Sequence, residues 1–410
     1  MAFKAKEIVP NLFWVGVLDK DLRVFDIIMH TPYGTSYNSF LLKTATHNVL
    51  FETCKENFTG ECLARIEDAI GKEAKIDYIV LNHTEPDHSG SLVHILERYP
   101  DATVVATSAA LMNIKSIGHI KPTTKTINSM QKRELDLGDV HLKFLIQPFL
   151  HWPDTMMTVI TELKVLVTCD VFGAHCADER VCDDLMEDRL PDLDDAYKHY
   201  FDCIFGPFKP YVLKGIAMIE TQMGFPVEEL KAVCCSHGPV LRKNIRDRIE
   251  LYRKYAQPPV LKNKVVIAYG SAYGYTEAMA HKIAEGVRAA GAEASVHDIV
   301  KSSVDAIMKD FEDAKGLLLG SPTLVGDALP PMYVILSNLN PIIHASRYVQ
   351  CFGSYGWSGE ATKNLGQRID QLKVKQPVPA LSCKFNPDED MLQSCFEWGQ
   401  KFATAIVEGK

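Results

Sequence analysis

The sequence predicts an α/β protein of two domains, with the boundary near residue 260. Its 410 residues exceed the roughly 100–200 residues of one ordinary domain. The stretch Tyr255–Lys264 contains two adjacent prolines, which fit neither a helix interior nor a central strand and therefore indicate a linker. On both sides of it, short apolar runs precede helical patterns, which is typical of strand–loop–helix units. We expect one domain over residues 1–260 and another over residues 261–410.

The composition is that of an ordinary globular protein, with 47% apolar and 23% charged residues. The formal net charge of -8 argues against nucleic acid and against an anionic membrane surface as partners. No apolar run approaches the roughly 18 residues that a membrane-spanning helix needs, and the N-terminus lacks an apolar signal-peptide stretch. We therefore expect a cytoplasmic protein that binds neither nucleic acid nor a membrane.

The cysteines predict neither a disulfide framework nor a zinc ribbon. The chain has 11 of them, an odd number, and no two have C-x-x-C spacing. Zinc-ribbon and rubredoxin-like iron sites need paired cysteines, so neither is expected here. We expect most of these thiols to be small, buried apolar groups.

Potential metal ligands crowd one stretch of the N-terminal half. This stretch, residues 81–90, follows a strand-like run and precedes a helical pattern. It holds four ligating side chains, which are His83, Glu85, Asp87 and His88. A solvated polar loop is the alternative, but four ligating types directly after a buried strand favour a metal site.

Three further candidate ligands each follow a strand-like run. They are His151 after residues 143–150, Asp170 after residues 163–169, and His237 after residues 231–236. Each alone is a weak signal, but loops at the ends of core strands converge on one cavity rim. Three ligands for each of two metals, with a carboxylate between the cations, leave positions open for a small substrate. One metal could be held by His83, Glu85 and His151, the other by Asp87, His88 and His237, with Asp170 bridging.

This ligand pattern resembles the metallo-β-lactamase superfamily in its flavodiiron branch. The resemblance implies an N-terminal αββα sandwich and two irons per chain, held by the seven ligands as grouped above, with no catalytic residue beyond them. The zinc hydrolases of the superfamily usually have histidine at the position of Glu85. A carboxylate is a harder, anionic ligand that suits redox-active iron, whereas zinc has no redox role. A dizinc hydrolase with an appended flavodoxin domain is the alternative, and Glu85 argues against it.

Several neighbours of these ligands carry weaker expectations. Asp154 could orient His151 through a hydrogen bond, with a surface turn as the alternative. His175 could reach the edge of the metal cavity, although a histidine satisfied elsewhere is the commoner case. Tyr197 and Tyr200 lie in an apolar helical pattern, so we expect both to pack in the core.

The second domain begins with a strand, a loop of small residues and a helix. The loop Ser271–Thr276 follows an apolar run, and the helical pattern after it ends at Gly291. Free N–H groups at a helix start bind an anion. The loop has neither the G-x-x-x-x-G-K-[ST] nor the G-x-G-x-x-G pattern, so a triphosphate or a Rossmann pyrophosphate is not expected. Two hydroxyls and no cation suit one phosphate monoester, with an ordinary βα turn as the alternative.

Two more loops follow strand-like runs at residues 316–320 and 348–352. In open parallel sheets, ligands bind outside the carboxyl ends of the strands. Together the three loops resemble flavodoxin over residues 265–405, which implies a doubly wound parallel sheet and FMN. The expected FMN contacts are Ser271, Ala272, Tyr273, Gly274, Tyr275, Thr276, Pro322, Thr323, Leu324, Val325, Gly326, Ser354, Tyr355, Gly356, Trp357, Ser358 and Gly359.

Two details of this cradle concern the flavin itself. Leu324 and Trp357 are candidates to flank the isoalloxazine ring, with packing at a domain or subunit surface as the alternative for Trp357. Asp327 stands in a stretch where the family often has asparagine. A negative charge there would repel a reduced flavin, so we expect a lower flavin potential than is usual.

The two halves together predict a reductase. Two ferrous ions and one reduced FMN supply the electrons that convert O2 to water, and NO reduction to N2O needs fewer. The resemblance to flavodiiron proteins covers essentially the whole chain and implies one or both reactions. No rubredoxin or flavin-reductase domain follows Lys410, so we expect a separate electron-donor protein of either type. The family's head-to-tail homodimer, or a homotetramer built from it, is also expected.

Overall fold

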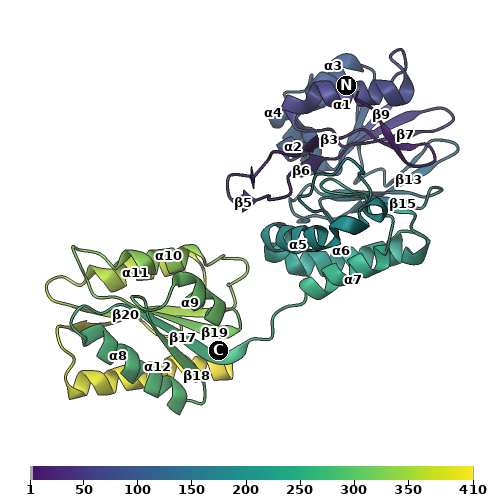
Figure 1. Ribbon diagram of the computed structural model, residues 1–410. Coiled ribbons are helices and arrows are strands. Elements are labelled where there is room, and N and C mark those ends of the chain that lie inside the picture. Colours follow the sequence, from purple (N-terminus) through teal and green to yellow (C-terminus); the bar gives the residue numbers. More distant parts are fainter. Residues whose placement is uncertain (1–2, 410) are drawn as a thin grey trace. The chain divides into compact units, whose positions relative to one another are not determined.

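The computed structural model describes residues 3–409 and divides the chain into two compact units (Figure 1). The first unit comprises residues 1–257 and the second comprises residues 258–410. Each unit has hydrophobic cores of its own. Within the described residues, no helix is both long and apolar enough to cross a membrane.

Two sheets form the centre of the first unit. The seven-stranded sheet has the order β1 (Lys6–Val9), β2 (Leu12–Trp14), β7 (Phe40–Lys43), β8 (Asn48–Phe51), β9 (Tyr78–Val80), β10 (Thr103–Ala106) and β11 (Thr126–Asn128). The five-stranded sheet has the order β12 (Glu134–Asp136), β13 (His141–Ile146), β14 (Met156–Ile160), β15 (Val165–Cys169) and β16 (Ala232–Cys235). Neighbouring strands are parallel from β8 to β11 and between β15 and β16, and antiparallel elsewhere.

Alternate residues of these strands face different cores, because side chains on a strand point to opposite faces. Phe40 and Phe144 belong to the core between the sheets, whereas their neighbours Leu41 and Leu145 pack with helical residues. Helices cover the outer faces of both sheets (Figure 1). They are α1 (Thr59–Ile70), α3 (Leu92–Arg98) and α4 (Ser108–Ile117) over the first sheet, and α5 (Leu190–Tyr200), α6 (Lys209–Gln222) and α7 (Ile245–Tyr255) over the second. The expected αββα sandwich is confirmed.

The second unit is a five-stranded parallel sheet with helices on both faces (Figure 1). The strand order is β18 (Glu293–Asp298), β17 (Lys262–Tyr269), β19 (Ala314–Gly320), β20 (Tyr348–Tyr355) and β21 (Leu381–Lys384). One face carries α8 (Tyr275–Ala289) and α12 (Glu389–Glu408), and the other carries α9 (Val304–Phe311), α10 (Pro330–Ser337) and α11 (Glu360–Gln371). This is the flavodoxin-like order of a doubly wound sheet, as expected.

Some expected element boundaries are wrong. Strand β13 ends at Ile146, so His151 lies in a loop five residues further on rather than at a strand end. Asp87 and His88 lie on a short helix, α2 (Pro86–Ser89), rather than in the connection before the expected helix. Strand β20 continues to Tyr355, three residues past its apolar run, because β21 pairs with its last four residues.

Candidate metal centre and cofactor loops

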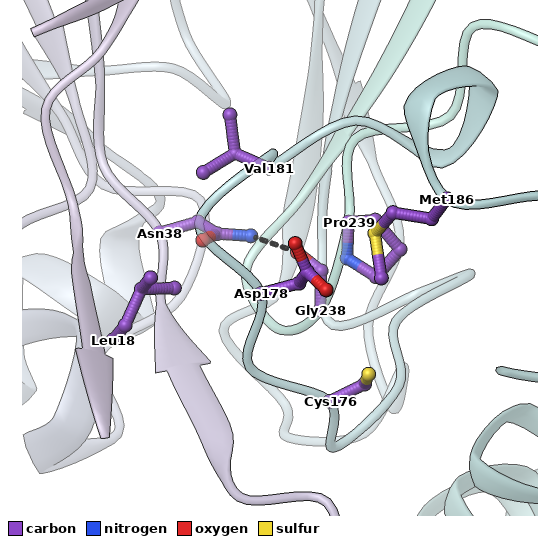
Figure 2. A pocket seen from close by; sticks show the side chains of 8 residues that line it. All are labelled: Leu18, Asn38, Cys176, Asp178, Val181, Met186, Gly238 and Pro239. Carbon is purple, nitrogen blue, oxygen red and sulfur yellow. Dashed lines mark hydrogen bonds between the residues drawn. The ribbon is translucent and has the colours of Figure 1, made fainter. Parts of the chain in front are cut away.

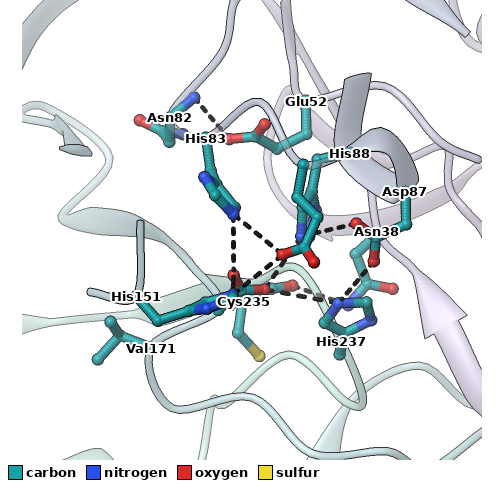
Figure 3. Close-up of polar contacts among 12 residues, drawn as sticks. Asn38, Glu52, Asn82, His83, Asp87, His88, His151, Val171, Cys235 and His237 are labelled. Atoms are coloured by element: carbon teal, nitrogen blue, oxygen red, sulfur yellow. Dashed lines mark hydrogen bonds and ion pairs between the residues drawn. The ribbon is translucent and has the colours of Figure 1, made fainter. Parts of the chain in front are cut away.

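The seven candidate ligands of the first unit lie together. Their ligating atoms form two groups, each within 4.8 Å, which are His83, Glu85, His151 and Asp170 in one and Asp87, His88 and His237 in the other. Figure 3 shows the four histidines turned toward one another. The residues come from the β9–α2 connection, from α2, and from loops after β13, β15 and β16, so separate parts of the sandwich meet at one point.

Asp170 lies between the two groups. Its Oδ2 is 3.4 Å from His151 Nε2 and 3.8 Å from His83 Nε2. Its Oδ1 is 3.1 Å from His88 Nε2 and 3.5 Å from His237 Nε2. Each carboxylate oxygen therefore faces one group, which is the arrangement that a carboxylate bridging two cations requires.

The charges in this cluster stabilise one another. Burial alone would raise the pKa of Asp170, but His88, His151 and His83 hold it well below its usual range. Burial would likewise lower the pKa of His151, but Asp170 and Glu85 raise it to about 10. Asp170 is therefore anionic at neutral pH, and the anionic carboxylate is the form that binds a metal ion.

Hydrogen bonds orient two of the histidines from behind. His237 Nδ1 donates to the Ser36 carbonyl at 2.7 Å, which leaves Nε2 to face Asp87 Oδ2 at 3.2 Å. His83 Nδ1 lies 3.1 Å from Asp154 Oδ1, so its Nε2 also faces the centre. We expected Asp154 to orient His151, and this prediction is wrong. The buried carboxylate contacts His83 and Thr84 instead. Such contacts set the tautomer and angle of a ligand.

Asn38 directly follows strand β6 (Thr35–Tyr37) and connects it to the loop that carries His237. The Asn38 amide donates to the Gly238 carbonyl at 2.8 Å (Figure 2) and to the Cys235 carbonyl, also at 2.8 Å. Its carbonyl oxygen accepts the indole N–H of Trp14 at 2.8 Å. Because the amide N–H groups and the carbonyl oxygen of this buried side chain all have hydrogen-bond partners, Asn38 holds the loop rigidly. The sequence analysis missed this residue, because its partners are mostly backbone carbonyls that leave no pattern in the sequence.

The residues behind His237 are aromatic or hydroxyl-bearing. The ring of His175 lies 5.2 Å from that of His237 and 4.8 Å from that of Tyr200. Thr35 Oγ1 is 2.9 Å from His175 Nδ1. His175 thus lies next to the centre, as considered, without belonging to either group of ligating atoms. Tyr200 and Tyr197 are both in the core.

The donor set fits a pair of metal ions. Both oxygens of Asp87, both oxygens of Asp170 and His88 Nε2 are buried, and their contacts with the described residues are ion pairs within the cluster rather than hydrogen bonds. Leaving buried polar atoms without hydrogen bonds is costly, so native proteins pair them or use them as ligands. Four imidazoles and three carboxylates, with no thiolate in the two groups, suit iron.

In the second unit, the three expected loops follow β17, β19 and β20, which are neighbours in the sheet. Hydrogen bonds join them. Thr276 Oγ1 and Ser354 Oγ are 2.9 Å apart, and the Thr323 N–H donates to the Ser354 carbonyl at 3.0 Å. The Ala361 N–H donates to Thr323 Oγ1 at 3.2 Å. The loops therefore form one rim at the carboxyl ends of the strands.

This rim fits a phosphate-bearing planar cofactor such as FMN. Helix α8 begins at Tyr275, directly after Gly274, whose φ of 82° turns the chain sharply into the helix. Ser271 Oγ is buried without a hydrogen-bond partner among the described residues, as a donor reserved for a phosphate would be. Trp357 is 95% exposed and Leu324 is 46% exposed, so both apolar faces are available to a ring.

Asp327 closes the turn after β19. It accepts hydrogen bonds from Asn364 Nδ2 at 2.9 Å and from the Tyr333 hydroxyl. These two contacts lower its pKa, so it is ionised at neutral pH. The effect of this charge on a flavin remains a prediction.

Comparison with known proteins agrees with this description. Residues 35–204 match the family described as "ODP family beta lactamase", and residues 267–399 match the flavodoxin family. The chain is 36% identical to the flavo-diiron protein FprA2 of Clostridium acetobutylicum, over 98% of this chain and 100% of that protein. It is 33% identical to a nitric oxide reductase of Moorella thermoacetica, over 98% of each.

A solved structure gives the same result. The rubredoxin oxygen:oxidoreductase of Desulfovibrio gigas superposes with a TM-score of 0.69 at 28% identity, covering 99% of each chain. A metallo-β-lactamase-like unit with a dinuclear donor set and a flavodoxin-like unit define a metal- and flavin-dependent oxidoreductase. The chain belongs to the flavodiiron protein family.

Proposed function

We propose that this protein reduces O2 to water, NO to N2O, or both, at a non-haem diiron centre. The observation that carries the proposal is the position of Asp170, with one oxygen toward each of two groups of ligating side chains. The two irons and FMN would supply the electrons for the reduction. A redox-inert zinc pair would gain nothing from a flavin, so the dizinc hydrolase is the weaker reading.

The two groups of candidate ligands would each hold one iron. His83, Glu85 and His151 would hold one iron, and Asp87, His88 and His237 the other, with Asp170 between them. Asp154 and the Ser36 carbonyl would keep two of the imidazoles in the binding tautomer.

A small opening reaches the ligands from outside. Its lining includes Asp26, Lys55, Glu85 and Asp87, and its volume is about 160 Å³. A diatomic substrate fits this space. The opening therefore supports a small gaseous substrate.

For the second unit we propose FMN, bound by the residues from Ser271 to Thr276, Pro322 to Gly326 and Ser354 to Gly359. Ser271 and Thr276 would contact the phosphate, and Leu324 and Trp357 the ring. The electrons would come from a separate donor of rubredoxin or flavin-reductase type, since relatives named for rubredoxin are similar over nearly the whole chain. All 11 cysteines are free thiols, which supports a reducing, cytoplasmic location.

Two measurements test this proposal. Protein made with ample iron should contain about two irons and one FMN per chain, by elemental analysis and flavin absorbance. Protein reduced without oxygen should be reoxidised rapidly on stopped-flow mixing with O2, with NO, or with both. Stoichiometric zinc with little iron would overturn the diiron assignment, and reduced protein inert to both gases would overturn the reaction.

A further inference from the structure

A cavity of about 630 Å³ lies between strand β13 and helix α6 of the first unit. Residues 143–148 form one wall, and the other wall is a single face of α6, made by Tyr211, Lys214, Met218 and Gln222. Residues spaced three and four apart share one side of a helix, so these four side chains face the same space. A volume of roughly 300–1,000 Å³ is usual for a site that holds a small organic molecule.

Three cationic side chains line this cavity, and they are Arg133, Lys143 and Lys214. Among the described residues, no carboxylate lines it. None of the three cations forms an ion pair within residues 3–409, although Glu134 is opposite Lys143 in the β12–β13 register. The chain has 52 acidic and 44 basic residues, so a space lined by cations alone is unexpected on it. Like charges repel one another, and an anion among them would offset that repulsion.

The three cations reach the cavity from separate elements. Arg133 immediately precedes β12, Lys143 is in β13, and Lys214 is in α6. A guanidinium offers a planar fork of N–H donors to a phosphate or carboxylate, and an ammonium binds phosphate as a point charge. Three such groups around one space fit a ligand with several negative charges, such as a phosphate ester, better than a single carboxylate.

The rest of the lining suits a flat, partly apolar body. Pro148 and Met218 are apolar, and Tyr211 adds an aromatic ring that packs on Phe149 with 4.9 Å between the ring centres. Gln222 ends α6 and offers both a donor and an acceptor, which is the combination that pairs with the edge of a purine. A bare inorganic anion would leave this part of the cavity uncovered. A ring joined to phosphate groups matches both parts.

We propose that this cavity binds a nucleotide, with the phosphates among the three cations and the base against Tyr211 and Met218. The site is separate from the loops proposed for FMN, which belong to the second unit and contain no cation from Ser271 to Thr276. The proposal goes beyond the proposed reduction of O2 or NO and does not rest on it, because no candidate iron ligand lines the cavity. An acidic segment of another protein is the competing ligand for these cations.

Binding is tested by calorimetric titration of the full-length protein, with its cofactors, against ADP. The wild type should bind one ADP per chain at this cavity. Lys143→Gln combined with Lys214→Gln should weaken the binding by roughly tenfold or more, because hydrogen bonds to charged groups are lost. Arg133→Gln, at an exposed position, should weaken it in the same way. Lys115→Gln, which removes an exposed cation of α4, should leave it unchanged. A wild type that does not bind ADP, or variants of the cavity that bind it equally well, would overturn the proposal.

The ring and the charge of the ligand are tested separately. Adenosine and inorganic pyrophosphate should each bind at least about tenfold more weakly than ADP, because each fills only one part of the cavity. Pyrophosphate that binds as tightly as ADP would show that the cavity recognises anions alone, and the assignment to a nucleotide would be wrong. A hexaglutamate peptide should not displace ADP. If this peptide displaces ADP and the double variant no longer binds it, the surface belongs to an acidic protein partner and the proposal fails.

Discussion

Asp170 shows how one side chain can organise a whole site. It follows Cys169, the last residue of β15, whose φ of 55° turns the chain so that the carboxylate enters the cluster of histidines. Four imidazole nitrogens lie 3.1 to 3.8 Å from its two oxygens. An anionic carboxylate between two cations offsets the repulsion between them.

Asp170→Asn should therefore lose at least one iron while FMN stays bound. The amide keeps the shape of the carboxylate but not its charge, so repulsion between the two cations is no longer offset. Iron is measured by elemental analysis and flavin by absorbance, and the flavin of the second unit serves as the internal control. A variant that keeps both irons and full turnover would show that Asp170 is not the bridge.

Among the elements, α8 and α12 pack unusually closely on one face of the second sheet. A Cβ atom on Gly286 of α8 would overlap the Phe396 carbonyl of α12, and one on Gly399 of α12 would overlap the Ile283 carbonyl of α8. Glycine therefore serves in both helices as a contact surface, despite its low helix propensity. This packing sets the angle at which α8 presents its N-terminus to the proposed phosphate.

Gly286→Ala should destabilise the second unit by about 1–3 kcal/mol, since the added methyl group must push the two helices apart. Gly366→Ala in α11 is the matched control, because a Cβ atom there meets nothing within 4 Å. That control should stabilise the unit by about 1 kcal/mol, the usual gain of alanine over glycine in a helix. Urea unfolding followed by circular dichroism measures both, and equal effects of the two changes would contradict the packing argument.

The connection between α10 and β20 carries a half-buried histidine with a pH-dependent effect. His344 Nδ1 accepts the Asn340 N–H at 2.9 Å, and its ring stacks on Phe311. Burial and the charge of Arg347 lower its pKa below the usual 6.5. The unfolded chain therefore binds a proton at His344 more readily than the folded unit does. The contribution of the neutral His344 to the stability of the fold is present above pH 6.5 and is lost as the pH falls.

His344→Asn should weaken this pH dependence, because an amide oxygen can accept the same hydrogen bond without titrating. The measurement is hydrogen exchange of β19 and β20, corrected for intrinsic rates, at about pH 7.5 and about pH 5.5, on either side of the ordinary histidine pKa. The wild type should lose more protection than the variant at the lower pH. Equal losses would mean that His344 is not responsible.

For the whole molecule, the exposed side chains around the flavin loops suggest a partner surface. Tyr273, Val325 and Trp357 are at least 81% exposed, although each is large and apolar. Apolar groups gathered at a binding rim often mark an interface. We propose a homodimer in which the flavin of one chain lies against the irons of the other, or a tetramer of two such dimers.

Mixed dimers test this assembly. One subunit carries changes at Ser271 and Thr276 that abolish flavin binding, and the other carries Asp170→Asn. In a head-to-tail pair, one of the two composite sites keeps both cofactors, so activity should recover to at most about half of normal, while each pure variant stays inactive. A fully active monomer, or mixed dimers that form without recovery, would exclude the arrangement.

The candidate metal ligands and the parallel second sheet could be predicted from the sequence. The His83–His88 stretch and the three later donors have side chains of metal-ligating types, and the strand–loop–helix pattern predicts that the loops carrying them converge. The parallel order of the second sheet followed from the same kind of local signal. These features were predictable because each depends on neighbouring residues or on the chemical type of one side chain.

Only the tertiary structure decided how those ligands are supported. Asp154 orients His83 across 71 residues, and the Ser36 carbonyl orients His237 across 201. Asn38 holds the His237 loop through backbone atoms. A backbone carbonyl looks the same at every position in a sequence, and a contact between distant residues exists only after the sheets have packed. The sequence therefore determined which atoms could bind metal, and the packing of two sheets determined which way those atoms point.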